Sequence, residues 1–169
     1  KPVHWCPECS SSLAEAEVEY IDKNSTAIDV KFKFDDSSND KLINKFKLDK
    51  KKNISLVIWT TTPWTIPGNQ AVCFSAEIDY QFIDSGSEYL LVAAELVEQC
   101  LDRWKDDSYE ATKIKFKGSE LEGLKSLHPL YKREAPLFLG DHVTTETGTG
   151  FVHTAPAHGV DDFNVCSSE

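Results

Sequence analysis

The stretch from Trp59 to Asn69 places the strongest constraint on how this chain of 169 residues can fold. It reads Trp-Thr-Thr-Thr-Pro-Trp-Thr-Ile-Pro-Gly-Asn, so it is rich in hydroxyl groups, and its prolines restrict the backbone. Apolar runs over residues 54–58 and 71–74 flank it and predict a buried strand on each side. A polar site held between two strands and an ordinary Thr- and Pro-rich connection both explain this pattern.

The composition indicates one globular domain. Hydrophobic residues make up 40% of the chain and charged residues 27%, which suits a domain with a real core. The formal net charge of −10 argues against a free-standing nucleic-acid-binding protein, because phosphate contacts dominate such binding. The sequence has neither a membrane-spanning run nor the apolar segment of a secretory signal, so we expect a cytoplasmic location and no membrane contact. Since the chain contains no Met, we expect it to be a segment of a longer protein.

The cysteines indicate half of a zinc site. Cys6 and Cys9 have the spacing of one zinc-binding pair, and His4 is a candidate third ligand. No second Cys-x-x-Cys pair follows in the sequence. We therefore predict no metal site within this chain, and zinc at Cys6 and Cys9 would need ligands from a parent protein. Without a secretory signal, the five cysteines are expected to be reduced.

The first half of the chain carries patterns typical of strands. Apolar and charged residues alternate over 16–20 and again over 28–34, which predicts a hairpin with its turn at 22–25. Residues 35–53 are polar and rich in Lys and Asp, so an irregular connecting segment with one short helical turn is expected there. A second hairpin is predicted over 80–92, where Asp-Ser-Gly-Ser separates two apolar runs.

The second half adds one helix and further short strands. Apolar residues over 93–104 recur at helical spacing and predict an amphipathic helix that packs on the sheet. Segments over 114–116, 137–139 and 142–143 are predicted as strands. Many short strands and few helices favour a mainly β fold with some α structure, in which a closed β-barrel carries short peripheral helices.

A second polar stretch lies near the end of the chain. Gly148-Thr149-Gly150 lacks the strand and helix that surround a dinucleotide-binding fingerprint, but its glycines would let the backbone approach a ligand closely. His153 and His158 cannot share one metal-binding helix face, because Pro156 lies between them. Asp161 and Asp162 are predicted to open a helical turn, where carboxylates are favoured.

Together these motifs resemble the isoleucyl-tRNA synthetase family, from end to end of the chain. In the sister valyl and leucyl enzymes the threonine loop typically reads Thr-Thr-Arg-Pro, whereas here it reads Thr-Thr-Thr-Pro-Trp. The signature motifs of the synthetic site are absent, so the resemblance covers the connective insertion that carries the editing site of this class I synthetase. The matching segments are His4-Trp5-Cys6-x-x-Cys9, Ala14-Glu15-Ala16-Glu17-Val18-Glu19-Tyr20, Trp59 to Thr65 with Pro67 and Asn69, and Gly148 to Asp162.

The resemblance implies a proofreading hydrolase within isoleucyl-tRNA synthetase. Its expected substrates are the tRNA(Ile) 3′ end that carries valine and, before transfer, valyl-adenylate. One editing domain is expected over 1–169, with a connection to the parent over 1–12 and the editing core over 13–165. ATP and Mg belong to the parent synthetase, no cofactor is expected in this segment, and the isolated segment is expected to be a monomer. The alternative is a non-catalytic module that only docks the tRNA acceptor end.

The resemblance also implies roles for individual residues. Asp162 matches the carboxylate that binds the substrate ammonium group, and Thr60, Thr61 and Thr62 match the motif that holds the ribose and a water molecule. Hydrolysis is expected to use that water, with help from the free hydroxyl of the terminal ribose. His153 is expected to exclude isoleucine by size. The other expected substrate-binding residues are Trp59, Asn69, Gly148, Thr149, Gly150, Ala155 and His158.

Overall fold

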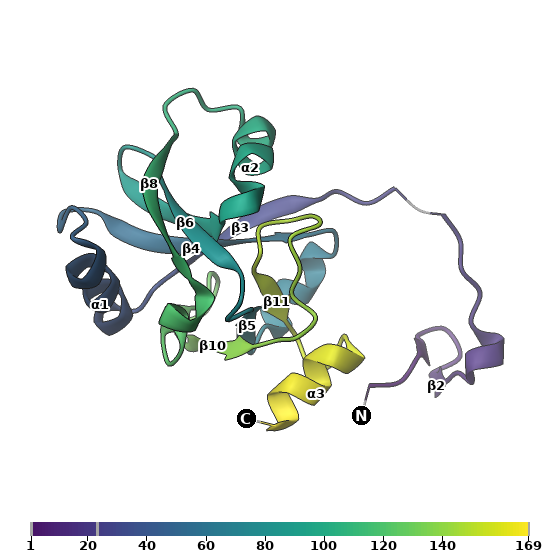
Figure 1. The fold of residues 1–169 in the computed structure, drawn as a ribbon. Helices are drawn as coiled ribbons and strands as arrows, with labels where there is room; N and C mark the ends of the chain where they lie inside the picture. The colour runs from purple at the N-terminus through teal and green to yellow at the C-terminus, as the bar shows by residue number, and fades with distance from the viewer. Residues whose placement is uncertain (1, 23, 169) are drawn as a thin grey trace.

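The computed structural model describes residues 2–22 and 24–168 and shows a mainly β protein with short helices (Figure 1). Lys23 belongs to the turn predicted over 22–25 and, like Lys1 and Glu169, lies outside the described residues. The strands are β1 (Trp5–Cys6), β2 (Ser11–Ser12), β3 (Ile28–Lys33), β4 (Asn53–Thr60), β5 (Ala71–Phe74), β6 (Asp79–Asp84), β7 (Glu88–Ala93), β8 (Glu110–Lys117), β9 (Lys125–Leu127), β10 (Glu134–Leu139) and β11 (Val152–Thr154). The helices are η1 (Glu15–Glu17), α1 (Asp36–Phe46), η2 (Pro63–Gly68), η3 (Ala94–Leu96), α2 (Val97–Trp104), η4 (Gly118–Leu121) and α3 (Val160–Ser168).

The larger sheet has five strands in the order β3-β4-β7-β6-β8. Its second strand, β4, pairs antiparallel with β3 and parallel with β7, so it has neighbours on both sides. This position explains the continuous apolar run over 54–58, because all five of these side chains are buried. At the edge of the sheet, β3 instead alternates buried Phe32 with exposed Lys31 and Lys33. The strands predicted over 28–34, 54–58 and 80–92 are confirmed.

A smaller sheet of four strands follows the order β11-β5-β10-β9. In this sheet β5, which follows the threonine-rich stretch, pairs antiparallel with β11, which lies within the second polar stretch. An isolated bridge between Phe34 and Ser126 connects it with the larger sheet. The prediction of a mainly β fold with short helices is confirmed. The pairings among the described residues do not form one closed ring, so closure into a barrel stays a prediction.

The core lies between the sheets and the helices that cover them. Phe46 of α1 packs on Phe82 of β6 and Phe116 of β8, with ring centroids 5.6 and 4.4 Å apart. These three side chains fix α1 against the open face of the larger sheet. On the described part of the chain, every helix is too short or too polar to cross a lipid bilayer.

The prediction of only one helical turn within 35–53 is wrong, because α1 runs for three turns. The Asp35 side chain caps its start and accepts a hydrogen bond from the Ser38 amide at 2.9 Å. Lys47 ends it in the left-handed conformation, with φ of 54°. The buried face of the helix includes the polar Ser38 and Asn39 as well as Leu42, so apolar residues alone did not reveal its period.

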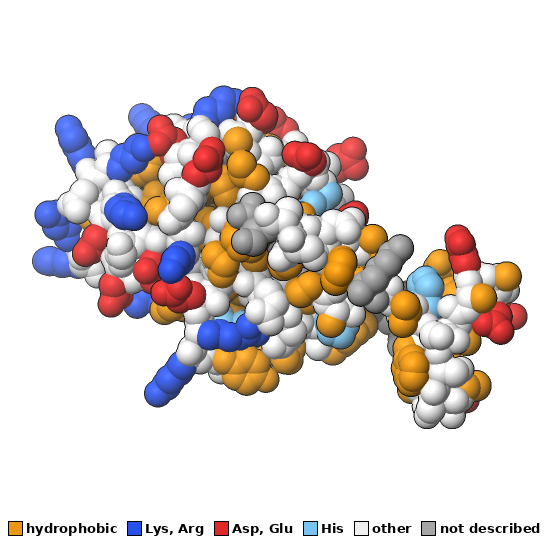
Figure 2. Space-filling view, turned by 90° about the horizontal axis from the view of Figure 1, so that it is seen from below, with side chains coloured by type: hydrophobic (Ala, Val, Ile, Leu, Met, Phe, Trp, Pro, Cys, Tyr) orange, Lys and Arg blue, Asp and Glu red, His pale blue; other side chains and the backbone are white. Residues whose placement is uncertain are grey.

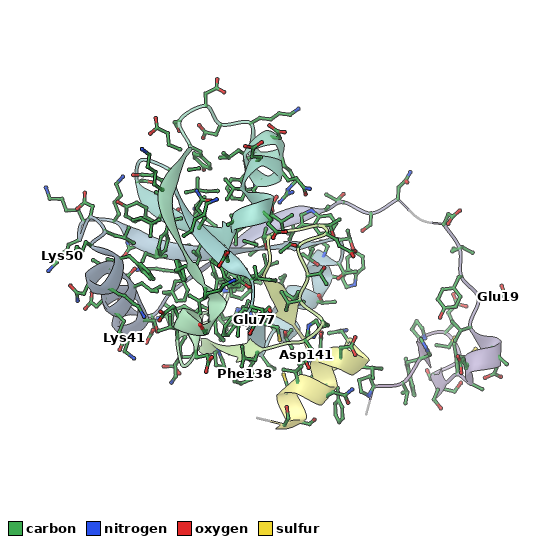
Figure 3. All side chains as sticks on the ribbon, in the orientation of Figure 1. Glu19, Lys41, Lys50, Glu77, Phe138 and Asp141 are labelled. Atoms are coloured by element: carbon green, nitrogen blue, oxygen red, sulfur yellow. The ribbon has the colours of Figure 1, made fainter. Side chains whose placement is uncertain are left out.

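Two predicted strands are also wrong. Residues 16–20 do not form a strand; η1 occupies part of this segment, and the Glu17 carboxylate accepts a hydrogen bond from the Ala14 amide at 2.7 Å. β3 therefore pairs with β4 rather than with a preceding strand. Residues 142–143 lie in a turn closed by the Val143 amide and the Gly140 carbonyl. Figures 1 and 3 show the reason for the first error, because the segment that carries Glu19 extends away from the sheets and finds no partner strand there.

Candidate active site

A pocket of about 340 Å³ opens where the end of β4, η2, β11 and the start of α3 meet. The two polar stretches, roughly ninety residues apart in sequence, form its opposite walls. Seven residues predicted for the site line it: Trp59, Thr60, Thr62, His153, Ala155, His158 and Asp162. The pocket thus combines hydroxyl groups, one carboxylate and imidazoles in a space of the size that holds one small ligand.

Hydrogen bonds arrange the threonine wall. Thr60 is buried at the end of β4, and its hydroxyl accepts a hydrogen bond from the Thr62 amide at 3.1 Å. The Thr62 hydroxyl lies 3.3 Å from the same oxygen. Thr61 is exposed and does not line the pocket; its carbonyl accepts a hydrogen bond from Ser25 at 2.5 Å. The pattern brings two of the three predicted hydroxyl groups onto the pocket surface.

His153 is held at both ring nitrogens. The Thr65 hydroxyl donates to the Thr62 carbonyl at 2.8 Å, so its oxygen is available to accept from His153 Nε2, which lies 2.9 Å away. On the other side the Asn69 amide nitrogen, a donor, lies 2.8 Å from His153 Nδ1. These contacts assign the proton to Nε2 and leave Nδ1 as an acceptor, so the imidazole is neutral and its orientation is fixed.

Asn69 contacts the pocket residue His153 but does not line the pocket. Its side chain is fully buried, and its amide nitrogen also donates to the Ala71 carbonyl at 2.7 Å. This bond ties the amide to the first residue of β5, next to β11, which carries His153. Asn69 therefore positions the imidazole and does not line the pocket itself.

Burial lowers the pKa of His153 below its ordinary value of 6.5, and the nearby Asp162 carboxylate opposes this shift. Below pH of about 6.5 the unfolded chain therefore binds a proton at this residue more readily than the folded chain, so stability falls as the pH drops. We expect the free energy of unfolding to fall more steeply from about pH 7 to about pH 5 in the native chain than in His153→Gln. Urea unfolding at several pH values measures this difference, and equal slopes for the two proteins would contradict it.

Asp162 projects from the first turn of α3, and the loop before this helix restrains its carboxylate. One oxygen, Oδ2, accepts a hydrogen bond from the Ala155 amide at 2.9 Å. Gly159 lies so close that an added Cβ would stand 3.1 Å from the carboxylate carbon. The neighbouring Asp161 is exposed and lines a different cleft, beside Asp141. The predicted helical turn at 161–162 is confirmed, and only the second of its carboxylates lines the pocket.

The Gly148-Thr149-Gly150 segment lies behind the pocket and does not line it. The Thr149 carbonyl accepts from the Ala93 amide at 2.7 Å, and the Gly150 carbonyl accepts from the Tyr80 hydroxyl at 2.8 Å. The carbonyl of Gly148 accepts from Arg103, whose guanidinium also forms two hydrogen bonds to Asp29. An added Cβ at Gly148 would lie 3.8 Å from the Trp59 side chain. The segment thus connects the sheet with the back of the wall formed by Trp59.

Replacing Gly150 with alanine is expected to destabilise the chain by about 2–4 kcal/mol. The backbone has φ of 80°, and an added Cβ would lie 2.4 Å from the Cβ of Ala93. Gly86 is a matched control, because it has φ of 83° but open space around it, so Gly86→Ala measures the backbone cost alone, about 1 kcal/mol. Equal losses for the two variants in denaturant unfolding would show that the close packing at Gly150 is unimportant.

Three lining residues were absent from the predicted set: Trp64, Thr65 and Val152. Thr65 lies three residues after Thr62, and a 3₁₀ turn such as η2 places such residues on the same side. That spacing was the available signal. Trp64 is 64% exposed and forms the outer edge of the pocket.

Comparisons with known proteins define the class of domain. A family model described as leucyl-tRNA synthetase, editing domain, matches residues 24–168. The fold is similar to the crystal structure of GlLeuRS-CP1, with a TM-score of 0.72 and 16% identity over 85% of this chain and 59% of that one. It is also similar to the P. falciparum cytosolic leucyl-tRNA synthetase editing domain, with a TM-score of 0.63 and 12% identity over 81% of this chain and 63% of that one. The chain belongs to the family of aminoacyl-tRNA synthetase editing domains.

Sequence relatives specify the member of this family. The chain is 53% identical to the isoleucine–tRNA ligase of Ruthia magnifica, over 98% of this chain and 17% of the ligase. It is 52% identical to that of Legionella pneumophila (strain Paris), over 99% of this chain and 18% of the ligase. The resemblance to the editing domain of isoleucyl-tRNA synthetase is thereby confirmed. The chain spans less than a fifth of the length of these relatives.

Proposed function

We propose that this pocket hydrolyses the ester bond between valine and the 3′ end of tRNA(Ile), and also hydrolyses valyl-adenylate. The observation that supports this most directly is that Asp162 and the Thr60 and Thr62 hydroxyl groups line one pocket. Valine is one methylene smaller than isoleucine, and a hydrophobic pocket gains only about 1–3 kcal/mol from a methylene, a rule for which isoleucyl-tRNA synthetase is itself the standard example. A second, hydrolytic site is therefore needed for accuracy.

In this proposal Asp162 binds the α-ammonium group through a charge-assisted hydrogen bond. The valine side chain lies against Thr65 and His153, which are fixed by their mutual hydrogen bond. Since both are held rigidly, the extra methylene of isoleucine cannot be accommodated by a small shift of the imidazole. Trp59 and the exposed Trp64 border the same space.

The Thr60 and Thr62 hydroxyl groups hold the ribose and the attacking water. Water adds to the ester carbonyl carbon, and the bond from that carbon to the ribose oxygen breaks. The proton from the water passes to the departing ribose oxygen, helped by the adjacent free ribose hydroxyl. The products are valine and tRNA with a free 3′ end. Asp162 binds the ammonium group and does not act as the base, because a carboxylate that took up the proton would lose the charge that holds the ammonium group.

A complete ligase that carries this chain tests the proposal. We expect multiple-turnover deacylation of Val-tRNA(Ile), with Ile-tRNA(Ile) hydrolysed much more slowly. Binding of the charged tRNA without turnover would instead support the non-catalytic docking module.

We also propose that the Cys6 and Cys9 pair binds zinc only with ligands from elsewhere in such a ligase. The Cys9 amide donates to the Cys6 sulfur at 3.2 Å, but the described residues hold no group of three or more candidate ligands.

A chelator is expected to leave hydrolysis unchanged, because the proposed mechanism holds its water with hydroxyl groups. The substrate for this measurement is 3′-O-valyl-adenosine, since tRNA itself needs Mg²⁺ for its fold. We expect the rate with EDTA to lie within about twofold of the rate without it. A large loss of activity that added Zn²⁺ or Mg²⁺ restores would contradict this mechanism.

A further inference from the structure

A second surface adjoins the pocket and has a different chemistry. The turn between β9 and β10 presents Leu130 and Tyr131, which are 62% and 51% exposed. Beside them runs a groove of about 410 Å³, lined by Leu127, His128, Tyr131, Lys132, Arg133 and Glu134. Lys and Arg side chains stand next to hydrophobic ones on the face of the molecule seen in Figure 2. Lys132 and Arg133 make this turn a local basic feature of a chain with a net charge of −10.

Hydrogen bonds fix this turn to the element that forms the edge of the pocket. His128 Nε2 lies 3.0 Å from the Ile66 carbonyl, and Arg133 donates to the Pro67 carbonyl at 3.2 Å. Both carbonyls belong to η2, which also supplies Trp64 and Thr65 to the pocket. The groove and the pocket therefore both adjoin η2.

Two neighbouring side chains pack against the Tyr131 ring and limit its movement. The Arg133 guanidinium lies 6.0 Å from the centroid of the Tyr131 ring, and the His128 ring lies 4.9 Å from it. Lys132 is exposed beside them, so its ammonium group is available to a ligand. Aromatic rings that stack on bases, together with nearby cations that contact phosphates, are the means by which proteins bind single-stranded nucleic acid.

We propose that Tyr131 and Lys132 bind the single-stranded 3′ end of tRNA, at the nucleotides just before the terminal adenosine. The pocket has room for about one aminoacyl-nucleoside, so the rest of the strand must leave it over an edge. The edge at η2 offers exposed Trp64 and leads to the turn that carries Tyr131 and Lys132. The proposal rests on one part of the proposed function, the binding of the terminal adenosine in the pocket, and not on hydrolysis there.

The test measures deacylation of two substrates by a complete ligase that carries this chain. The native ligase is compared with the double variant Tyr131→Ala/Lys132→Ala. For Val-tRNA(Ile) we expect KM for deacylation to rise about tenfold or more, because a stacked base and a phosphate contact are lost. The dependence of log KM on log salt is expected to weaken by about one, as for the loss of one phosphate contact. For 3′-O-valyl-adenosine, which lacks the upstream nucleotides, KM and kcat should be unchanged.

The control variant is Tyr20→Ala/Lys50→Ala, which removes the same two side chains from exposed positions. Tyr20 is on the amino-terminal segment, and Lys50 lies near α1, far from that segment (Figure 3). The control variant should keep the native KM for Val-tRNA(Ile). Tyr131→Phe keeps an aromatic ring, so it should retain stacking. The proposal is overturned if the Tyr131/Lys132 variant keeps the native KM for Val-tRNA(Ile), or if it impairs folding of the ligase as expected for a surface covered by another domain.

A separate binding measurement distinguishes failure of this proposal from failure of the proposed function. A fluorescent oligoribonucleotide with the sequence of the tRNA 3′ end is titrated with this chain and with the double variant. We expect Kd for the variant to be about tenfold higher. If the ligase hydrolyses neither substrate but this difference is found, the proposed function fails and the docking surface stands. Equal Kd values overturn the docking surface whatever the hydrolysis shows.

Discussion

Replacing Asp162 with asparagine is expected to lower kcat/KM for deacylation of Val-tRNA(Ile) by about 100-fold. The substitution removes the charge that binds the α-ammonium group. It keeps an oxygen that can accept the hydrogen bond from the Ala155 amide, so the start of α3 should retain its structure. The measurement is steady-state deacylation by a complete ligase that carries this chain.

The control for Asp162 is the adjacent carboxylate. Asp161→Asn removes the same charge one residue earlier, on a side chain that lines a different cleft, and should change kcat/KM little. A substrate in which a hydroxyl replaces the ammonium group gives a second control. With this substrate the kcat/KM of the native ligase should fall by about as much as Asp162→Asn lowers it with the natural substrate. The kcat/KM of Asp162→Asn should fall no further with this substrate. Native activity in Asp162→Asn would remove the anchor from the proposed mechanism.

Replacing His153 with alanine is expected to make Ile-tRNA(Ile) a substrate. The native preference for valine over isoleucine should fall by about 10- to 100-fold, because the imidazole no longer fills the space that the extra methylene needs. Loss of the ring also leaves Thr65 and Asn69 without their shared partner, so slower turnover of both substrates is expected. The ratio of kcat/KM values for the two charged tRNAs is the measured quantity.

His153→Gln provides the matched comparison for size exclusion. Glutamine keeps much of the volume of histidine and a polar end, so the preference for valine should largely remain. If His153→Ala still rejects isoleucine as strongly as the native ligase, exclusion by the imidazole is wrong. If both variants accept isoleucine equally, the fixed orientation of the ring matters more than its volume.

The sequence predicted local features well where each depended on neighbouring residues. The buried run over 54–58, the hairpin over 80–92 and the helix within 93–104 all have periods that appear in their own residues. The predicted strand over 16–20 had the right alternation and failed because a strand also needs a partner. The parallel pairing of β4 with β7 joins segments more than thirty residues apart, and no local pattern specifies it.

The site shows the same division. Trp59, Thr60, Thr62, His153 and Asp162 were predicted from the family resemblance that two polar motifs carry, and the fold brings them into one pocket. The contacts that orient the imidazole could not be read from the motifs, because they join residues 65 and 69, which precede β5, to residue 153 in β11. The supporting role of 148–150 was hidden for a related reason, since glycines beside a ligand and glycines beside a packed strand look alike in sequence.

In the proposed function the pocket binds valine attached to adenosine, with the ammonium group of valine on Asp162. A crystal structure of this chain with a non-hydrolysable valyl-adenosine mimic tests it most directly. The proposed function predicts the ammonium nitrogen within hydrogen-bond distance of the Asp162 carboxylate, the side chain against Thr65 and His153, and the ribose beside Thr60 and Thr62. A mimic that binds in this pocket with its ammonium group away from Asp162, or that binds only elsewhere on the chain, would contradict this binding mode.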